Sequence, residues 1–169
     1  MSNRIEVLKG NIAKIKVDAI VNAANTSLLG GGGVDGVIHR AAGPELLEFN
    51  RKLGGCPTGE AKISPGFKLP AKFIIHTVGS VWNGGKNNED KLLANCYENS
   101  LKLAVENKIK TIAFPAISTG VYRFPLERAT KIAVTEVKKF LEKHDSIEKV
   151  IFVCFDEETS RVYEKILKD

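Results

Sequence analysis

Strand-like and helix-like segments alternate along the chain, which predicts an α/β domain: a mostly parallel sheet with helices on both faces. Short apolar runs such as residues 17–21 and 73–78 are typical of strands buried on both faces. Residues 89–107 carry apolar side chains at helical spacing. Loops rich in glycine, asparagine or hydroxyl residues follow several strands, and sheets of this kind bind their ligands at that edge.

The first half of the chain contains most of the predicted strands. We expect strands over residues 5–8, 17–21, 61–64 and 73–78, and helices over 36–42 and from Pro44 onward. Val37, Ile38 and Ala41 share one face of the first helix. Pro44 suits the first turn of the second helix, because an N–H at that position has no partner within a helix.

The second half contains three longer helices. We expect a helix over residues 89–107, a strand over 111–115, a helix that Pro125 begins, a strand over 150–155, and a last helix that begins at Asp156. We find no linker, internal repeat or low-complexity tract, so residues 1–169 form one domain. Hydrophobic residues make up 43% of the chain, enough for a sizeable core.

The charge and the cysteines limit the classes of function. The net charge of +5 suits anionic ligands, but the basic residues are spread out and form no arginine-rich arm for nucleic acid. Cys56, Cys96 and Cys154 are an odd number without a CxxC pair, so we expect reduced thiols and no zinc site. The N-terminal six residues lack an export signal, and no run of about 20 apolar residues is present. We therefore expect a cytoplasmic protein that does not contact membranes.

Residues 21–40 are the most informative stretch. Four consecutive glycines, residues 30–33, lie between a strand end and a helix that starts behind Asp35. Glycine runs carry a large entropy cost, so a folded domain keeps one mostly where its backbone comes close to something. Backbone N–H groups of such a loop and of the following helical turn form an anion cradle. The stretch therefore predicts a site for a phosphate-containing ligand.

Each part of this stretch also has a structural interpretation. The glycines can be a plain surface loop, Asp35 can be a helix N-cap, and Asn25 can be a turn former. Residues 31–36 fit GxGxxG formally, but residues 24–30 separate them from the strand that a dinucleotide fingerprint requires. Asn25 and Asp35 flank the glycines together, and this favours the functional interpretation.

Other candidate site residues follow later strands. Ser118, Thr119 and Gly120 offer hydroxyl and N–H groups for a phosphate or ribose. Phe155 ends a strand, where it is either a core residue or a platform for a base. Together with residues 10–12 and 22–36, these loops can line one crevice. His39, His76 and His144 lie on different predicted elements; we read His76 as a core strand residue and assign no histidine to catalysis.

Five stretches of this chain resemble the macrodomains, specifically the MacroD-type ADP-ribosyl hydrolases that include bacterial stand-alone members. They are VDAIVNAAN (17–25), GGGGVDGVIHRAAG (30–43), CPTGEA (56–61), IIHTVG (74–79) and FPAISTGVYRFP (114–125). The resemblance covers nearly the whole chain. It implies a three-layer α/β/α sandwich with a mixed, mostly parallel six-stranded sheet that binds ADP-ribose at its crest.

The resemblance also assigns residues to parts of the ligand. Asn11 would accept a hydrogen bond from the adenine amine and Phe155 would stack on the adenine, while Asn25, Gly32, Asp35 and Tyr122 would surround the distal ribose. Backbone N–H groups of residues 33–34 and 118–121 would bind the diphosphate. The full expected binding set is Asn11, Ile12, Ala23, Gly32, Gly33, Val34, Ser118, Thr119, Gly120, Val121, Tyr122 and Phe155.

The implied reaction is hydrolysis of an ester at the distal ribose, with Asn25 and Asp35 as the catalytic residues. The implied substrates are proteins mono-ADP-ribosylated on Asp or Glu, or O-acetyl-ADP-ribose. A bound water attacks, activated by Asp35 or by the substrate's own phosphate. No metal or redox cofactor is needed, and we expect a monomer. Two alternatives remain: an ADP-ribose reader without turnover, and an RNA-interacting regulator.

Three positions depart from the family pattern. Asn11 replaces the usual Asp, which removes charge assistance from the adenine contact, an effect of about 1 kcal/mol. Ser80 replaces a frequent Pro, with little expected effect. Arg123 replaces a frequent Gly. If the backbone there needs a positive φ, the loop must differ slightly from the family pattern. Alternatively, Arg123 adds a cation near the diphosphate.

Overall fold

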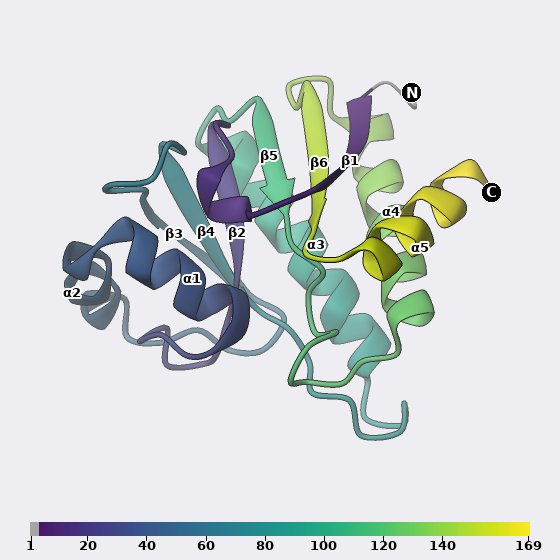
Figure 1. The fold of residues 1–169 in the computed structure, drawn as a ribbon, viewed down its shortest axis with the longest axis horizontal. Coiled ribbons are helices and arrows are strands. Elements are labelled where there is room, and N and C mark those ends of the chain that lie inside the picture. Colours follow the sequence, from purple (N-terminus) through teal and green to yellow (C-terminus); the bar gives the residue numbers. More distant parts are fainter. Residues whose placement is uncertain (1–3) are drawn as a thin grey trace.

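A six-stranded sheet lies between two layers of helices in the computed structural model, which describes residues 4–169 (Figure 1). The strands are β1 (Ile5–Lys9), β2 (Ala19–Ala24), β3 (Ala61–Pro65), β4 (Phe73–Val78), β5 (Thr111–Phe114) and β6 (Lys149–Cys154). The helices are the 3-10 helix η2 (Ile12–Lys14), α1 (Gly33–Ala42), α2 (Pro44–Leu53), α3 (Glu89–Glu106), α4 (Leu126–Lys143) and α5 (Glu157–Lys168). Residues 1–3, half of the N-terminal stretch that we searched for an export signal, lie outside the described residues.

The strand order is β1-β6-β5-β2-β4-β3. The pairs from β1 to β4 are parallel, and the edge strand β3 is antiparallel to β4. This confirms the expected mixed, mostly parallel sheet. Pro65 lies in β3, where a residue without an N–H is tolerated because the edge strand has a neighbour on one side only.

The two central strands build a core on each face of the sheet. Successive strand residues point to opposite faces, and so Ile20 and Ile74 pack with η2, α1 and α2. Val21 and Ile75 belong to the second core, which contains the buried faces of α3, α4 and α5. Figure 1 shows these two helical layers on either side of the sheet.

Two elements, β2 and α1, differ by more than one residue from those that the sequence predicted. Strand β2 covers residues 19–24, not 17–21, because its pairing with β4 continues through Asn22, opposite His76, to Ala24, opposite Val78. A polar residue at position 22 hides this continuation from a hydrophobicity pattern. Helix α1 begins at Gly33, not at residue 36, so part of the glycine run supplies its first turn.

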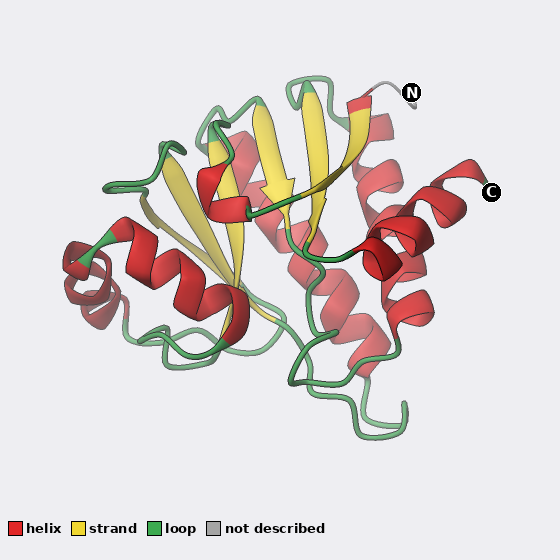
Figure 2. Cartoon of the chain, in the orientation of Figure 1, coloured by secondary structure: helices red, strands yellow, loops and turns green. Residues whose placement is uncertain are grey.

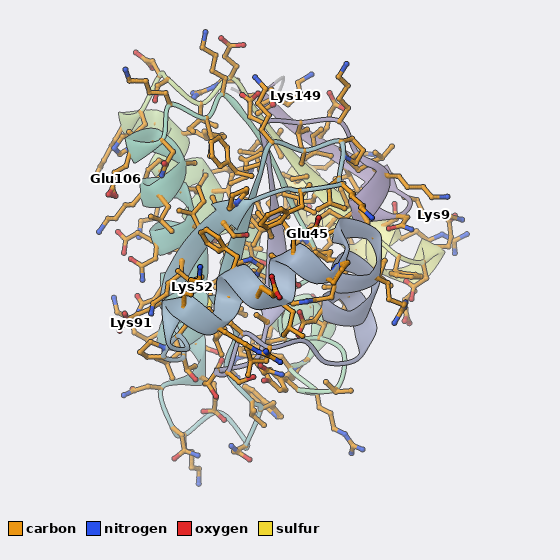
Figure 3. All side chains as sticks on the ribbon, turned by 90° about the vertical axis from the view of Figure 1, so that its left-hand side faces the viewer. Lys9, Glu45, Lys52, Lys91, Glu106 and Lys149 are labelled. Carbon is orange, nitrogen blue, oxygen red and sulfur yellow. The ribbon has the colours of Figure 1, made fainter. Side chains whose placement is uncertain are left out.

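The loops that follow the carboxyl ends of the parallel strands gather along the lower edge of the sheet (Figure 2). Charged side chains such as Lys9, Lys91 and Glu106 instead project from the periphery (Figure 3). Within residues 4–169, none of the helices is both long and apolar enough to cross a membrane. The three cysteines are buried free thiols.

Candidate functional site

A crevice runs along the loop-bearing edge of the sheet. It consists of two adjoining cavities with volumes of about 260 and 420 Å³. Their walls share Gly33, Val34, Ala116 and Gly120, so the two cavities lie next to each other. The crevice therefore offers the two ends of a ligand different surroundings.

Most of the predicted site residues line this crevice. The first cavity is lined by the predicted residues Ala23, Asn25, Gly32, Gly33, Val34, Asp35, Ser118, Gly120, Val121 and Tyr122. The second is lined by Ile12, Gly33, Val34, Thr119, Gly120 and Phe155. Asn11 lies between the lining residues Gly10 and Ile12, but its side chain accepts a hydrogen bond from the Ala13 N–H at 3.0 Å and caps η2.

The glycines have two different roles in the crevice wall. A Cβ atom added to Gly32, Gly33 or Gly120 would meet no atom within 4 Å apart from its chain neighbours, so the space beside these three lining glycines is open. A Cβ atom on Gly31 would instead lie 3.2 Å from Asp35 Oδ2 and 3.3 Å from Asn25 Nδ2. The two predicted catalytic side chains thus converge on Gly31. The run is not a plain surface loop.

Asp35 is the third residue of α1, and the N-cap of this helix is Gly32. The interpretation of Asp35 as an N-cap is therefore wrong. Asp35 is 4% exposed; its Oδ1 accepts a hydrogen bond from Asn22 Nδ2 at 2.8 Å and lies 3.4 Å from His39 Nε2. Burial raises the pKa of Asp35 above its ordinary value, while the bond from Asn22 and the charge of His39 oppose this shift.

Asn25 closes the turn that follows β2. Its Oδ1 accepts hydrogen bonds from Ser27 Oγ at 2.7 Å and from the Leu28 N–H at 3.2 Å. Its Nδ2 donates to the Gly30 carbonyl at 2.9 Å. The turn-forming interpretation is confirmed, and Asn25 also lines the first cavity. The same contacts fix its amide beside Asp35.

Sequence reasoning missed a buried polar chain behind Asp35. Asn22 Nδ2 lies 3.1 Å from His76 Nδ1, and His76 Nε2 lies 2.9 Å from Ser64 Oγ. All three residues are at most 2% exposed. Burial, and secondarily the charge of His39, lower the pKa of His76 to about 3. His76 is a core strand residue as predicted. Its contact with Asn22 has no local sequence signal, except that each residue interrupts an apolar strand.

The loop after β5 adopts strained backbone geometry. Ser118 has φ of +69° and Arg123 has φ of +60°, in the left-handed region that favours glycine. The Phe124 N–H donates to the Ser118 carbonyl at 2.9 Å and closes the loop. The backbone at Arg123 thus does have the positive φ that we considered, and the arginine adopts it at a cost of order 1 kcal/mol.

Two exposed apolar side chains flank the crevice. Phe155 is 69% exposed and Val121 is 88% exposed. Phe155 lies just beyond β6 and lines the second cavity. It is therefore not a core residue, and its ring can contact a ligand.

A second buried carboxylate, that of Glu89, organises a neighbouring loop. It accepts hydrogen bonds from the N–H groups of Asn83 at 2.6 Å, Gly85 at 3.1 Å and Asn87 at 2.7 Å. Burial alone would raise the pKa of Glu89, but these donors lower it to about 2. Trp82 connects this loop to the crevice, because its backbone N–H donates to the backbone carbonyl of Tyr122 at 2.8 Å.

Further contacts hold the same loop from outside. The Arg128 guanidinium lies 4.9 Å from the Trp82 ring centroid and pairs with Asp90 at 2.7 Å. Ser80, where the family often has proline, donates from Oγ to the Glu89 carbonyl at 2.9 Å. This departure from the pattern therefore adds a buried hydrogen bond at the start of α3.

Comparison with known proteins places these features in a family. Residues 21–133 match the Macro domain family. A Macro domain-containing protein of Chlorobaculum tepidum is 62% identical over 163 residues, covering 96% of this chain and 95% of that protein. A protein of Escherichia fergusonii named O-acetyl-ADP-ribose deacetylase is 58% identical over 171 residues, covering 99% and 97%.

Solved structures agree with the sequence comparison. A mutant of the Oceanobacillus iheyensis macrodomain with ADPR superposes with a TM-score of 0.93 at 46% identity, covering 97% of this chain and 91% of that chain. The Trypanosoma brucei macrodomain in complex with ADP-ribose gives a TM-score of 0.91 at 45% identity, covering 96% and 68%. The fold and the sequence thus point to one family.

Proposed function

The chain belongs to the macrodomain family, and from this premise we propose that it binds ADP-ribose and hydrolyses an ester at the distal ribose. The substrates are O-acetyl-ADP-ribose and proteins mono-ADP-ribosylated on Asp or Glu. One observation carries the proposal: Asp35 Oδ2 and Asn25 Nδ2 converge on Gly31 at one end of a glycine-walled crevice. Relatives named O-acetyl-ADP-ribose deacetylase support it.

The second cavity receives the adenine. Phe155 is exposed at its wall and offers a ring face for stacking. Ile12 contributes an apolar contact from the opposite loop. Adenine is flat and aromatic, and its faces stack on rings and apolar side chains, so this combination of groups suits it better than it suits a sugar.

The diphosphate lies where the two cavities meet. Gly33 and Val34 form the first turn of α1 at this point, and their N–H groups have no partner within the helix. The positive end of the helix dipole also favours an anion there. Gly120, across the crevice, has no side chain that would keep the phosphates away from its backbone.

The distal ribose and its ester then reach the first cavity, beside Asp35. The ionised carboxylate accepts a proton from a water molecule as the water oxygen bonds to the acyl carbon. The ester bond between the acyl carbon and the ribose oxygen breaks, and the proton passes from Asp35 to that oxygen. The products are a carboxylic acid and ADP-ribose. The Asn25 amide, fixed by its turn, orients the ribose hydroxyls.

Incubation of the purified protein with O-acetyl-ADP-ribose, and separately with a Glu-linked mono-ADP-ribosylated protein, tests this function. We expect release of ADP-ribose by the wild type, and loss of release in Asp35→Ala with ADP-ribose binding retained in calorimetry. Asp145→Ala removes an exposed carboxylate elsewhere and serves as the control. Binding without release by the wild type would reject the hydrolase and leave the reader module. Binding of RNA that survives saturating ADP-ribose would instead indicate the RNA-interacting regulator.

A further inference from the structure

A line of hydrogen-bonded side chains crosses the interior from α1 to the edge strand. Asp35 on α1 accepts from Asn22 on β2 at 2.8 Å, and Asn22 lies 3.1 Å from His76 on β4. His76 reaches Ser64 on β3 at 2.9 Å. Asn22 and His76 are direct partners in the parallel register of β2 and β4. This series of hydrogen-bonded side chains therefore crosses three adjacent strands, β2, β4 and β3, whose positions Figure 1 shows.

The donors and acceptors of this chain fit one arrangement of protons. Ser64 Oγ donates to the Pro65 carbonyl at 3.2 Å, so it accepts from the N–H at His76 Nε2. His76 Nδ1 is then an acceptor for one N–H of Asn22, and the second N–H of Asn22 is given to Asp35 Oδ1. The imidazole is neutral in this arrangement. If the Asn22 amide were flipped, its oxygen would face both the His76 acceptor and the Asp35 carboxylate. The hydrogen bond to His76 prevents this flip, so Asn22 presents an N–H to Asp35 and favours the ionised carboxylate.

The fold has no packing need for these groups. The neighbouring strand positions, such as Val21, Ile74 and Ile75, are apolar and fully buried. An amide, an imidazole and a hydroxyl in the same interior each cost free energy unless hydrogen-bonded, and well-packed apolar side chains are often at least as stable there. The Asn22 Oδ1 atom even lacks a hydrogen-bond partner within the described residues. These buried polar side chains are therefore best explained by what they do for Asp35, the residue at the end of the hydrogen-bonded series.

We propose that Asn22, held by His76 and Ser64, is the positioning residue for Asp35: it fixes Oδ1 so that Oδ2 faces Asn25 and the crevice. The inference rests on the proposed hydrolase function and extends it into the sheet. Two titratable groups face Asp35, namely His39 from its own helix and His76 from β4 through Asn22. Neither replaces the bond from Asn22: His39 Nε2 makes no hydrogen bond within the described residues, and His76 contacts Asn22 and not Asp35 itself.

The substitution Asn22→Leu tests the bond directly. Leucine has a similar size, and it leaves no space for a water that would donate in place of the amide. Loss of a hydrogen bond to the charged form raises the pKa of a carboxyl, so we expect the ascending limb of the pH–kcat profile to move up by about one to two pH units. At neutral pH we expect kcat to fall about 10-fold because the carboxylate is no longer held in line with the attacking water, while the Kd for ADP-ribose changes by less than about threefold.

A matched pair at position 76 separates positioning from mere stability. In His76→Asn an amide oxygen near the place of Nδ1 still accepts from Asn22, whereas His76→Leu removes the acceptor. Both variants lose stability, but we expect only His76→Leu to move the pH profile in the direction of Asn22→Leu. Thr130→Val removes a buried hydroxyl whose 2.7 Å bond to Leu126 lies in α4, and it controls for loss of a buried polar group. Its profile should match that of the wild type.

The Asp35 carboxyl can also be titrated by 13C NMR without any substrate. The titration midpoint of Asp35 should rise in Asn22→Leu and in His76→Leu. It should stay at the wild-type value in His76→Asn and in Thr130→Val. An unchanged Asp35 midpoint in both leucine variants would overturn the inference even if the wild type is active. A wild type that hydrolyses neither ester refutes the hydrolase instead, and the NMR midpoints still decide whether Asn22 controls Asp35. If Asn22→Leu does not fold, the pair at position 76 decides alone.

Discussion

Asp35, in the crevice wall, and Glu89, in a neighbouring loop, are two buried carboxylates with opposite surroundings. One side-chain amide donates to Asp35, and the opposing effects of burial and this donor leave its pKa raised. Three backbone N–H groups donate to Glu89, and they lower its pKa to about 2. Both side chains lie at the start of a helix, so helix position does not explain the difference.

The difference shows how a carboxylate is made structural or reactive. Glu89 has its charge satisfied by the loop that it folds, and it offers little to a ligand. Asp35 has one oxygen held and the other on the Gly31 side, with its charge only partly compensated. A carboxylate in that state accepts a proton more readily than an ordinary one. We therefore propose that incomplete hydrogen bonding beside the crevice marks Asp35 as the group that performs the chemistry.

The largest expected effect comes from exchanging the two acids for their amides. Asp35→Asn should lower kcat for O-acetyl-ADP-ribose by about 100-fold or more, because an amide cannot accept the proton of the attacking water. Glu89→Gln should leave kcat near that of the wild type, since Glu89 does not touch the crevice wall. Steady-state kinetics of both variants measures this. A larger loss in Glu89→Gln than in Asp35→Asn would reverse the assignment.

A smaller effect is expected from two glycine substitutions that separate chemistry from binding. Gly31→Ala places a Cβ atom 3.2 Å from Asp35 Oδ2 and 3.3 Å from Asn25 Nδ2, so both must move, and kcat should fall about 10-fold. Gly120→Ala places a Cβ atom in open crevice space, so it should weaken ADP-ribose binding and leave kcat almost unchanged. Neither glycine has a positive φ, so alanine fits both backbones. Calorimetry together with kinetics checks the pair, and equal effects on kcat would contradict it.

The smallest expected effect is at the adenine end. Asn11 already uses Oδ1 to cap η2. Asn11→Asp keeps that cap and replaces the amide nitrogen by a second acceptor oxygen, which can receive the adenine amine. We expect ADP-ribose binding about fivefold tighter, equivalent to about 1 kcal/mol, with similar turnover. Weaker binding in calorimetry would refute this account of the adenine contact.

Much of the fold and of the crevice could be predicted from the sequence. Strand and helix periodicities gave the order of the elements, and the four loops after strands do meet at one edge. The hydrophobicity pattern misplaced the ends of β2 and the start of α1 for one reason. Asn22 and the glycines have polar or absent side chains, while their secondary structure is set by pairing with β4 and by the first turn of a helix.

The contacts of Asp35 could not be predicted in the same way. The partnership of Asn22 with His76 joins residues 54 positions apart and depends on the register of two parallel strands. The proximity of His39 depends on Asp35 lying inside α1 and not at its cap. Both are tertiary consequences that leave no local pattern. Buried polar residues in otherwise apolar strands are the one signal that could have drawn attention to them.

The thermal stability of Asp35→Asn and Glu89→Gln as a function of pH tests the central contrast most directly. The folded-state pKa of Asp35 is raised, so ionisation of Asp35 destabilises the fold as pH rises above about 4. The Tm of Asp35→Asn should therefore be higher than that of the wild type at neutral pH. This difference in Tm should shrink as the pH is lowered. The folded-state pKa of Glu89 is lowered to about 2, so its stabilisation is present above about pH 4.5 and is lost as pH falls toward 2. Glu89→Gln should therefore melt below the wild type at neutral pH. Opposite signs for the two variants are the expected result, and a lower Tm for both at neutral pH would contradict the account.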